Sequence, residues 1–334
     1  MHMQPGPANA PNADPPLSRL GLGTWAFGRT GWGVQHDRDS RAAILRAIEC
    51  GVTWIDTAAV YGDGHAESVV GDTLSEICES DRPLVFTKGG VCIDPSSGAT
   101  FRDLRPASLR AQCEASLRRL GLERIDLYQL HWPVADAVAV EQAWEALSEL
   151  QSEGKVHKIG VSNFGVALLD RCARNRPVDA LQAPMSLLSR SAARDLLAWA
   201  FEHSVPTLAY SPLESGLLSG RFSLKRLQSL PGGDWRRSRE QFREPRLART
   251  LDLLECLAPI AESLDMSLAE MALVWTLTWP GVAGAIVGAR TAEQVDGWAR
   301  APKLLLDASA LERIEAALLE TRAGEGPTHP SGDL

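Results

Sequence analysis

Residues 106–131 read PASLRAQCEASLRRLGLERIDLYQLH and contain the parts of one repeating unit. Residues 106–120 have the period of a helix, and Gly121 follows as its stop. Residues 125–131 then form an apolar run rich in β-formers. Because this run does not strictly alternate between apolar and polar residues, we expect a strand with both faces covered by protein.

The order of helix, glycine and strand recurs along the chain, as in parallel strands joined by crossover helices. The predicted strands are 19–23, 52–56, 83–88, 125–131, 158–162, 179–183, 206–211 and 282–288. The predicted helices are 39–50, 67–80, 106–120, 137–153, 166–175, 192–203, 246–264, 267–278, 292–300 and 308–322. Such units fit one closed barrel, so we expect an α/β fold that is a single (β/α)8 TIM barrel.

A doubly wound open sheet is the competing fold. Its dinucleotide-binding fingerprint is G-x-G-x-x-G at the first strand-to-helix turn. Here Gly21-Leu22-Gly23 continues to Phe27 and Gly28 without the third glycine that opens the helix. The barrel is therefore favoured.

Composition and charge restrict the class of protein. Hydrophobic residues are 45% of the 334 residues and charged residues 23%, as in a globular protein with a large core. The formal net charge of −8 argues against binding to nucleic acid or to an anionic membrane, either of which needs a concentrated basic face. The run Arg236, Arg237 and Arg239 is too short to change this.

No window approaches the ~18 consecutive apolar residues of a membrane span, and no export signal is visible, so we expect a cytoplasmic protein.

The cysteine pattern and the composition of the chain ends give the remaining expectations about cross-links and domain bounds. The six cysteines form neither a C-x-x-C pair nor a Cys/His cluster, so we expect no disulfide framework and no metal site. The two ends are rich in Pro, Gly and polar residues. We therefore expect a disordered N-terminal tail over 1–16, one domain over 17–322 and a flexible C-terminal tail over 323–334.

Four polar residues fall at or after the ends of neighbouring predicted strands, where the functional groups of a barrel lie. Asp56 ends the second strand, and Tyr61 follows it within DTAAVYG. Lys88 ends the third strand and His131 the fourth. Each alone has an ordinary interpretation, namely a loop or capping acid, a packed tyrosine, a surface lysine and a hydrogen-bonded core histidine. Their coincidence favours a catalytic site.

Carbonyl reduction explains this combination. Hydride addition develops negative charge on the carbonyl oxygen, so the site must deliver a proton and stabilise an oxyanion. We expect Tyr61 to be the general acid, with Lys88 lowering the pKa of its phenol. Asp56 would keep Lys88 protonated by pairing with it, and His131 would orient the carbonyl through a hydrogen bond. None of these residues moves two electrons, so a cofactor must.

With these residues aligned, the chain resembles the aldo-keto reductases from about residue 19 to residue 322. The stretches that carry the resemblance are LGLGTW (20–25), WIDTA (54–58) with Tyr61-Gly62, FTKG (86–89), SLRRL (116–120), DLYQLHWP (126–133), GVSNF (160–164), YSPL (210–213) and IVGAR (286–290). The pattern is most similar to the bacterial branch of general-stress and inositol-induced reductases, which is also similar to potassium-channel β-subunits. This resemblance implies an oxidoreductase of the alcohol dehydrogenase (NADP+) type that reduces aldehydes and ketones with NADPH.

The resemblance also implies a cofactor, NADPH/NADP+, lying across the barrel mouth. Ser162, Asn163 and Gln182 would hydrogen-bond its carboxamide, and Tyr210 would stack on the nicotinamide. The pyrophosphate would be wrapped by a loop containing Ser211, Pro212, Leu213, Ser215, Gly216 and Leu217. Arg290 would clamp the adenosine 2′-phosphate, which favours NADPH over NADH. The remaining implied contacts are Trp25, Asp56, Gly288 and, on the adenine side, Gln294, with the neighbouring Gly297 and Trp298 departing from the pattern of the branch.

The substrate pocket is expected to be largely apolar and to take a small carbonyl compound. Its expected lining is Trp25, Phe27, Tyr61, His131 and Trp132. Residues 222–245 are long for a connection, and both a lid over the cofactor and a loop without function stay open. The segment before residue 19 is too short and too rich in proline to form the hairpin that usually caps the bottom of the barrel in this family. We therefore expect this floor of the barrel to be covered by the final helix or by no element.

Two other functions stay open. The likeness to channel β-subunits allows a non-catalytic NADPH-binding regulatory subunit, although the complete set of four residues favours turnover. Alternatively, Lys88 would be the Schiff-base amine of a barrel lyase or aldolase. The expected assembly is a monomer or a weak homo-oligomer.

Overall fold

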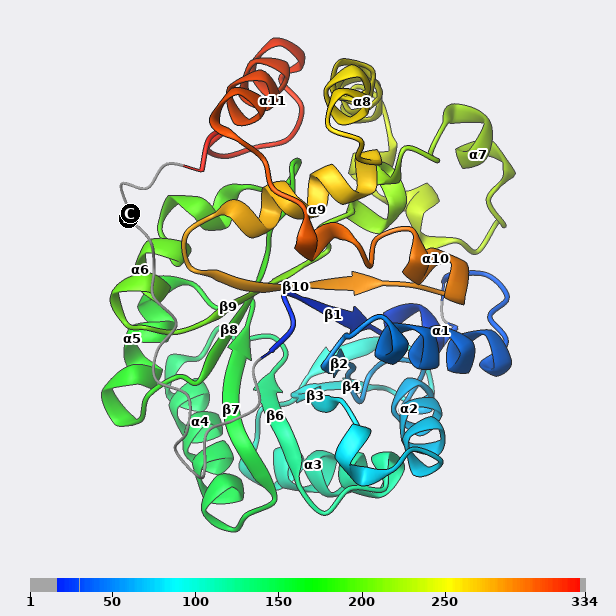
Figure 1. The fold of residues 1–334 in the computed structure, drawn as a ribbon. Helices are drawn as coiled ribbons and strands as arrows, with labels where there is room; N and C mark the ends of the chain where they lie inside the picture. Colours follow the sequence, from blue (N-terminus) through cyan, green and yellow to red (C-terminus); the bar gives the residue numbers. More distant parts are fainter. Residues whose placement is uncertain (1–16, 30, 331–334) are drawn as a thin grey trace.

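The centre of the fold is a closed barrel of parallel strands (Figure 1). The computed structural model describes residues 17–29 and 31–330, and the strands follow one another in the order β1-β10-β9-β8-β7-β6-β3-β2. Their bounds are β1 Leu20–Gly23, β2 Trp54–Asp56, β3 Leu84–Gly89, β6 Ile125–Leu130, β7 Val156–Ser162, β8 Ala180–Pro184, β9 Thr207–Tyr210 and β10 Val282–Gly288. Leu22 pairs with Val287 on one side and with Ile55 on the other, which closes the ring. The predicted single (β/α)8 barrel is confirmed.

Helices surround the barrel on its outer side (Figure 1). Their bounds are α1 Asp37–Glu49, α2 His65–Ser75, α3 Pro106–Leu120, α4 Ala137–Ser152, α5 Val166–Asn175, α6 Leu196–Glu202, α7 Leu224–Ser229, α8 Arg246–Ser263, α9 Leu268–Thr278, α10 Ala292–Asp296 and α11 Ala308–Thr321. Apolar side chains on the inner faces of the helices, such as Ile44 and Leu147, are fully buried in the main core. This layer between helices and strands holds the barrel rigid around the site.

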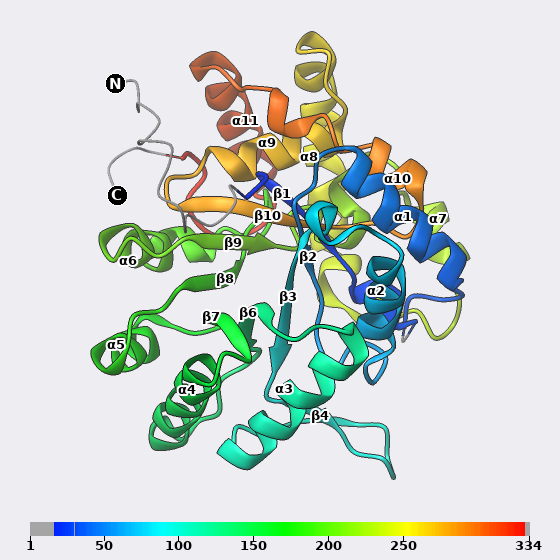
Figure 2. The same ribbon diagram turned by 60° about the horizontal axis from the view of Figure 1, so that its bottom comes forward.

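Local differences from the predicted elements occur mainly at helix ends. Helix α2 ends at Ser75 instead of 80, and α10 ends at Asp296 instead of 300. The predicted helix 192–203 is a 3₁₀ helix, Ser191–Arg194, followed by α6. Tertiary contacts, rather than sequence period, decide such terminal turns. An antiparallel hairpin of β4 (Val91–Ile93) and β5 (Thr100–Arg102) was not predicted, because such short strands carry no period; it projects beyond the barrel near α3 (Figure 2).

Trp54 fills the amino-terminal end of the barrel. Its indole is fully buried against the Phe86 ring, with the centroids 5.1 Å apart, and its Nε1 donates to the Ser18 carbonyl at 2.9 Å. A Cβ on Gly21 would lie 2.4 Å from the indole, so glycine is required there. The floor is therefore filled from inside. Of the two alternatives expected for the floor, coverage by the final helix is excluded, because α11 packs against α8 outside the barrel (Figure 1).

Residues 323–330 are packed against the protein, which corrects the expectation of a flexible tail for this part. Ala323 is 1% exposed, and its carbonyl accepts a hydrogen bond from Arg190 Nη1 at 3.1 Å. Ser189 and Glu325 form a parallel bridge. Composition alone misses this order because the contacts are with a segment far away in the sequence. The predicted N-terminal tail over 1–16 and residues 331–334 lie outside the described residues.

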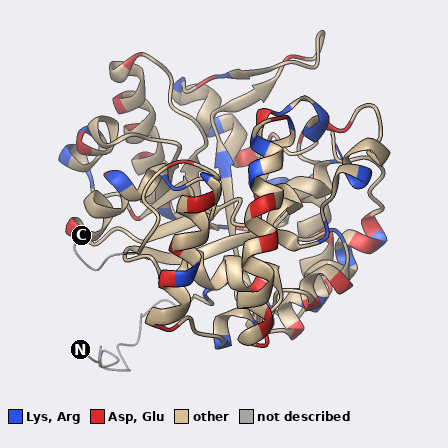
Figure 3. Ribbon diagram, turned by 90° about the horizontal axis from the view of Figure 1, so that it is seen from above, with Lys and Arg blue, Asp and Glu red and all other residues tan. Residues whose placement is uncertain are grey.

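The surface carries both signs of charge. Lys and Arg are interspersed with Asp and Glu over the outer helices (Figure 3). Within residues 17–29 and 31–330, no helix combines the length and the apolar character needed to cross a membrane.

Candidate active site

The carboxyl ends of the barrel strands share one rim, because all of these strands are parallel. Asp56 ends β2, Lys88 lies one residue before the end of β3, and His131 directly follows β6. Tyr61 comes from the turn between β2 and α2. Its ring centroid lies 5.4 Å from Lys88 Nζ and 5.8 Å from the centroid of the His131 ring. The structure thus brings the four predicted catalytic residues together.

Asp56 and Lys88 form a buried ion pair. Lys88 Nζ donates to Asp56 Oδ1 at 2.5 Å and to the Thr57 carbonyl at 2.9 Å. The Lys88 side chain is 0% exposed and that of Asp56 4%. Burial raises the pKa of Asp56 and lowers the pKa of Lys88, and the attraction between the two charges opposes both shifts. Neither group can lose its partner without leaving a charge in a dry site.

The pKa of Tyr61 differs in direction from the expectation. Burial raises the pKa of the Tyr61 phenol above 10.0, and the Asp56 carboxylate adds to the rise. The Asp56 carboxylate, bonded to Lys88, offsets the ammonium charge that was expected to lower this pKa. The phenol is therefore held firmly in its protonated form, which is the form that can give a proton.

His131 is neutral in this environment. Burial lowers the pKa of its imidazole well below 6.5, and the nearby Lys88 charge lowers it further. Its Nδ1 is buried and has no hydrogen-bond partner among the residues that the structure describes. A buried polar atom without a partner is uncommon, and it suits a group that awaits a ligand.

A second buried charge supports β3 behind the site. Glu67 on α2 is fully buried, and it accepts hydrogen bonds from Thr87 Oγ1 at 2.6 Å and from Arg119 Nε at 2.7 Å. Thr87 immediately precedes Lys88, so this contact fixes the backbone from which the lysine projects.

Two glycines fix the backbone of Tyr61. A Cβ on Gly28 would lie 2.7 Å from the Tyr61 carbonyl carbon and 2.6 Å from the Gly62 nitrogen. A Cβ on Gly62, whose φ is +64°, would lie 2.4 Å from the Gly28 oxygen. The 3₁₀ helix Trp25–Gly28 and the Tyr61 turn therefore approach each other backbone to backbone.

Gly28→Ala is expected to lower kcat for carbonyl reduction by about 10²-fold, because a shift of about 1 Å in a catalytic group has effects of this size. Steady-state kinetics would measure it. The matched control is Gly232→Ala, where the added Cβ meets nothing within 4 Å and kcat should stay the same. Unchanged kcat in Gly28→Ala would show that the contact does not position Tyr61.

The residues predicted to contact the nicotinamide and its carboxamide lie at the end of β7, within β8 and at the end of β9. Gln182 Nε2 donates to Asp56 Oδ2 at 2.8 Å, and Asn163 Nδ2 donates to the His131 carbonyl and to Ser162 Oγ, both at 3.0 Å. Tyr210 Oη donates to Asn163 Oδ1 at 2.7 Å. Hydrogen bonds therefore join Gln182 to the Asp56 carboxylate, and Tyr210 through Asn163 to the backbone of His131.

The loop after β9 has an unusual backbone. Ser211, Glu214 and Ser215 have positive φ values of 55°, 46° and 56°, and Gly216 has a φ of 99°. Turns that contain left-handed residues can direct backbone N–H groups toward an anion; the N–H groups of Glu214 and Gly216 already donate to the Ser211 and Leu213 carbonyls, both at 2.9 Å. The Glu214 side chain is buried and accepts a hydrogen bond from Ser186 Oγ at 2.7 Å, which turns its charge inward. Pro212 and Leu217 are also buried, so they would meet a ligand only through the backbone.

Arg290 lies two residues after the exposed Gly288 that ends β10. Its Nε donates to Gln35 Oε1 at 2.8 Å, and its backbone N–H donates to Gln294 Oε1 at 2.8 Å. Gln294, predicted to contact adenine, thus already uses its oxygen to hold Arg290. Burial lowers the pKa of Arg290, as does the like charge of Arg236. Two guanidinium groups near each other are the donors expected for a phosphate.

The stretch 222–245 supplies residues that the sequence analysis did not assign to the site. Arg236 pairs with Asp234 at 2.7 Å, and its Nη1 donates to the Ser215 carbonyl at 3.4 Å. Trp235 packs against Trp25, with ring centroids 5.0 Å apart. The stretch is thus anchored to the loop after β9 and to the segment between β1 and α1. The signals in the sequence were the length of this stretch, which kept a lid over the cofactor open, and the short basic run that begins at Arg236.

The predicted substrate pocket needs one correction. Trp25 is 40% exposed and Trp132 is 38% exposed, whereas Phe27 is 0% exposed and belongs to the main core. Phe27 is on the buried side of the 3₁₀ helix that carries Trp25, so it supports this helix instead of lining a pocket.

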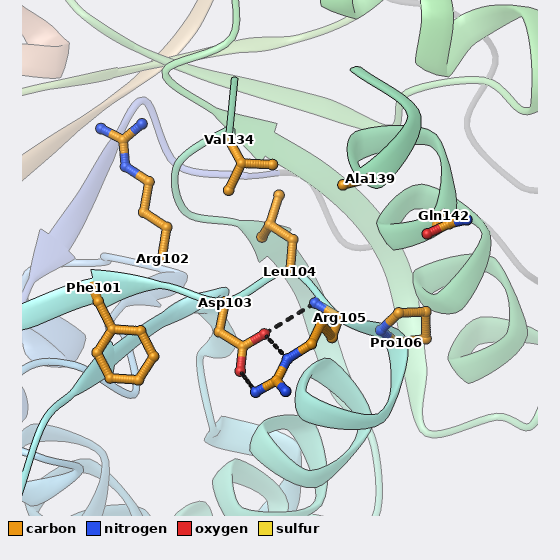
Figure 4. A pocket seen from close by; sticks show the side chains of 9 residues that line it. All are labelled: Phe101, Arg102, Asp103, Leu104, Arg105, Pro106, Val134, Ala139 and Gln142. Carbon is orange, nitrogen blue, oxygen red and sulfur yellow. Dashed lines mark hydrogen bonds and ion pairs between the residues drawn. The ribbon is translucent and has the colours of Figure 1, made fainter. Parts of the chain in front are cut away.

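A surface hollow beside the β4–β5 hairpin is distinct from the predicted site (Figure 4). Its lining includes Phe101, Val134 and Gln142, and none of its lining residues belongs to the predicted site. Asp103 and Arg105 are bonded to each other within it, at 2.5 Å for the shortest contact. Arg102, which also lines the hollow, donates to the Pro133 carbonyl at 2.6 Å and lies over the Trp132 ring.

Comparison with known proteins identifies the family. The model of the aldo/keto reductase family matches residues 19–319, so the chain belongs to this family of oxidoreductases that act on carbonyl groups. Aldo-keto reductase YhdN of Bacillus subtilis is 35% identical, over 84% of this chain and 83% of the relative. A protein of Escherichia coli named NADH-specific methylglyoxal reductase is 33% identical, over 84% of this chain and 88% of the relative.

Solved structures agree with this assignment. Glycerol dehydrogenase AKR11B4 from Gluconobacter oxydans has a TM-score of 0.85 and 34% identity, with coverage of 96% of this chain and 97% of that chain. An aldo-keto reductase from Klebsiella pneumoniae in complex with NADPH has a TM-score of 0.69 and 26% identity, and 95% of each chain is covered.

Proposed function

We propose that this chain reduces aldehydes and ketones to alcohols with NADPH, an activity of the alcohol dehydrogenase (NADP+) type. The observation that carries the proposal is the 2.5 Å Lys88–Asp56 pair beside Tyr61 and His131 at the carboxyl rim of the barrel. Its test is multiple-turnover oxidation of NADPH in the presence of 4-nitrobenzaldehyde or methylglyoxal.

Each of the four residues has a role that follows from its environment. The bound nicotinamide supplies the hydride. Tyr61, protonated because its pKa is raised, gives its phenolic proton to the carbonyl oxygen. Neutral His131 donates a hydrogen bond that orients this oxygen. The Lys88 ammonium, whose Nζ lies 5.4 Å from the centroid of the Tyr61 ring, would stabilise negative charge as it forms on the phenol, against the opposing effects of burial and of the Asp56 carboxylate.

The donor set on the cofactor side fits a dinucleotide with a third phosphate. The loop of Ser211, Ser215 and Gly216 would hold the pyrophosphate, and Arg290 the 2′-phosphate, with Arg236 between them through its contact with Ser215. The NADH specificity in the name of the Escherichia coli relative means that nucleotide choice cannot be taken from the family. In this chain, the guanidinium of Arg290 is the group that favours NADPH over NADH.

The rate of reduction is expected to show a broad plateau with pH. His131 is in its neutral form above its lowered pKa, so loss of this form begins only below 6.5. Tyr61 is in its proton-donating form below its raised pKa, so loss of this form begins only above 10.0. A profile of kcat/KM should therefore be flat from pH 6.5 to pH 10. An alkaline limb near neutral pH would contradict the direction of the Tyr61 shift.

Arg290→Ala is expected to raise KM for NADPH about 10- to 100-fold, because a charge-assisted contact to phosphate is worth about 1.5–3 kcal/mol. KM for NADH should stay within about 2-fold, since NADH lacks the 2′-phosphate. Steady-state kinetics with both dinucleotides measures the two values. Equal use of NADPH and NADH by the unaltered protein would contradict the assignment.

The environment of Lys88 also bears on the alternatives. A Schiff-base lysine must be a free amine that reaches its substrate. The Lys88 amine is instead fully buried and bonded to Asp56 and Thr57, which disfavours a lyase or aldolase. A regulatory subunit would bind NADPH without multiple turnover, so the same assay distinguishes it.

A further inference from the structure

Gln35 joins the segment between β1 and α1 to the predicted 2′-phosphate site at Arg290. It is 6% exposed and lies two residues before α1, more than two hundred residues from Arg290 in sequence. Its carboxamide is fully used: Nε2 donates to the Arg290 carbonyl and to Ser40 Oγ, both at 2.9 Å, and Oε1 accepts from Arg290 Nε at 2.8 Å. Ser40 is itself 0% exposed, so the orientation of the amide is fixed from both ends.

This contact determines how the Arg290 guanidinium is presented. Its Nε and Nη2 groups are held on one edge by Gln35 and by the Val34 carbonyl. No residue within 17–29 and 31–330 accepts a hydrogen bond from Nη1, so this end remains available for a ligand. A planar guanidinium fixed along one edge is preorganised for a phosphate, because little rotamer entropy is lost on binding.

The charges around Arg290 favour an anion at its free end. The like charges of Arg236 and Arg226 act on Arg290, and the carboxylates that oppose them include Asp234, which is already paired with Arg236. We propose that Gln35 is a positioning residue that aims Arg290 at the adenosine 2′-phosphate and thereby sets the preference for NADPH over NADH. This inference rests on the proposed function.

The test measures equilibrium binding, with NADP+ and NAD+ as probes in isothermal titration calorimetry. Gln35→Met keeps the length of the side chain but removes all three hydrogen bonds. It should raise Kd for NADP+ about 5- to 20-fold and leave Kd for NAD+ within about 2-fold, because the two probes differ only in the 2′-phosphate. Gln35→Glu keeps an acceptor for Nε but neutralises Arg290, so it should raise Kd for NADP+ further.

A double-mutant cycle separates positioning from a general structural effect. In an Arg290→Ala background, Gln35→Met should change Kd for NADP+ by less than about 2-fold, because the group that it positions is gone. The matched control is Gln142→Met on α4, where the side chain is exposed and neither Kd should change.

Three results would overturn the inference in distinguishable ways. If Arg290→Ala lowers the preference for NADP+ but Gln35→Met does not, Gln35 does not position Arg290. If Gln35→Met weakens both dinucleotides equally, its role is structural. If Arg290→Ala leaves the preference unchanged, the nucleotide assignment itself fails, and the role of Gln35 fails with it.

Discussion

Tyr61→Phe is expected to lower kcat for carbonyl reduction by about 10²- to 10⁴-fold, the usual contribution of a positioned general acid. The substitution removes only the phenolic oxygen, and the ring stays in contact with His131 and Trp25. The dinucleotide site should therefore be unaffected, and Kd for NADPH should change by less than about 2-fold. Single-turnover kinetics would measure the chemical step directly.

Tyr128→Phe is the matched control for this experiment. Tyr128 is also buried, on the barrel strand β6, and its hydroxyl donates to the Leu109 carbonyl at 3.5 Å, away from the predicted site. Its kcat should stay within about 2-fold of the parent. Retained turnover in Tyr61→Phe would show that another group donates the proton, and the role given to Tyr61 would be wrong.

Lys88→Met is expected to abolish turnover and also to lower the free energy of unfolding by about 3–5 kcal/mol. The reason is that Asp56, 4% exposed in its side chain, would keep a buried charge without its partner. Unfolding in urea, followed by circular dichroism, measures the loss.

The double variant Asp56→Asn/Lys88→Met tests the cause of this loss. Because it removes both charges, it should recover most of the stability lost in Lys88→Met while remaining inactive. A Lys88→Met protein as stable as the parent, or a double variant less stable than Lys88→Met, would contradict the account of the ion pair.

The barrel and the four predicted catalytic residues could be predicted because both leave local signals. The strands are apolar runs bounded by glycine, and polar residues such as Asp56 and Lys88 stand out where such runs end. A parallel barrel then brings all these ends to one rim. The position of Tyr61 followed from its short distance in sequence from Asp56.

The features that escaped prediction depend on contacts between distant segments. Arg236 reaches Ser215 from an irregular stretch, and Gln35 reaches Arg290 across almost the whole chain. Phe27 was misplaced because the sequence does not tell which side of a single 3₁₀ turn faces the core. The direction of the Tyr61 pKa shift was missed because the sequence does not show how deeply the phenol is buried, or that the Asp56 carboxylate lies close enough to add to the rise.

Transfer of deuterium from NADPH that carries deuterium in place of both hydrogens at C4 of the nicotinamide tests the central claim most directly. Mass spectrometry of the alcohol formed from 4-nitrobenzaldehyde should show one deuterium at the carbinol carbon with the parent protein, and labelled alcohol should form about 10²- to 10⁴-fold more slowly with Tyr61→Phe. An alcohol without deuterium, or NADPH binding without any alcohol, would contradict the proposal that this site reduces carbonyls by hydride transfer.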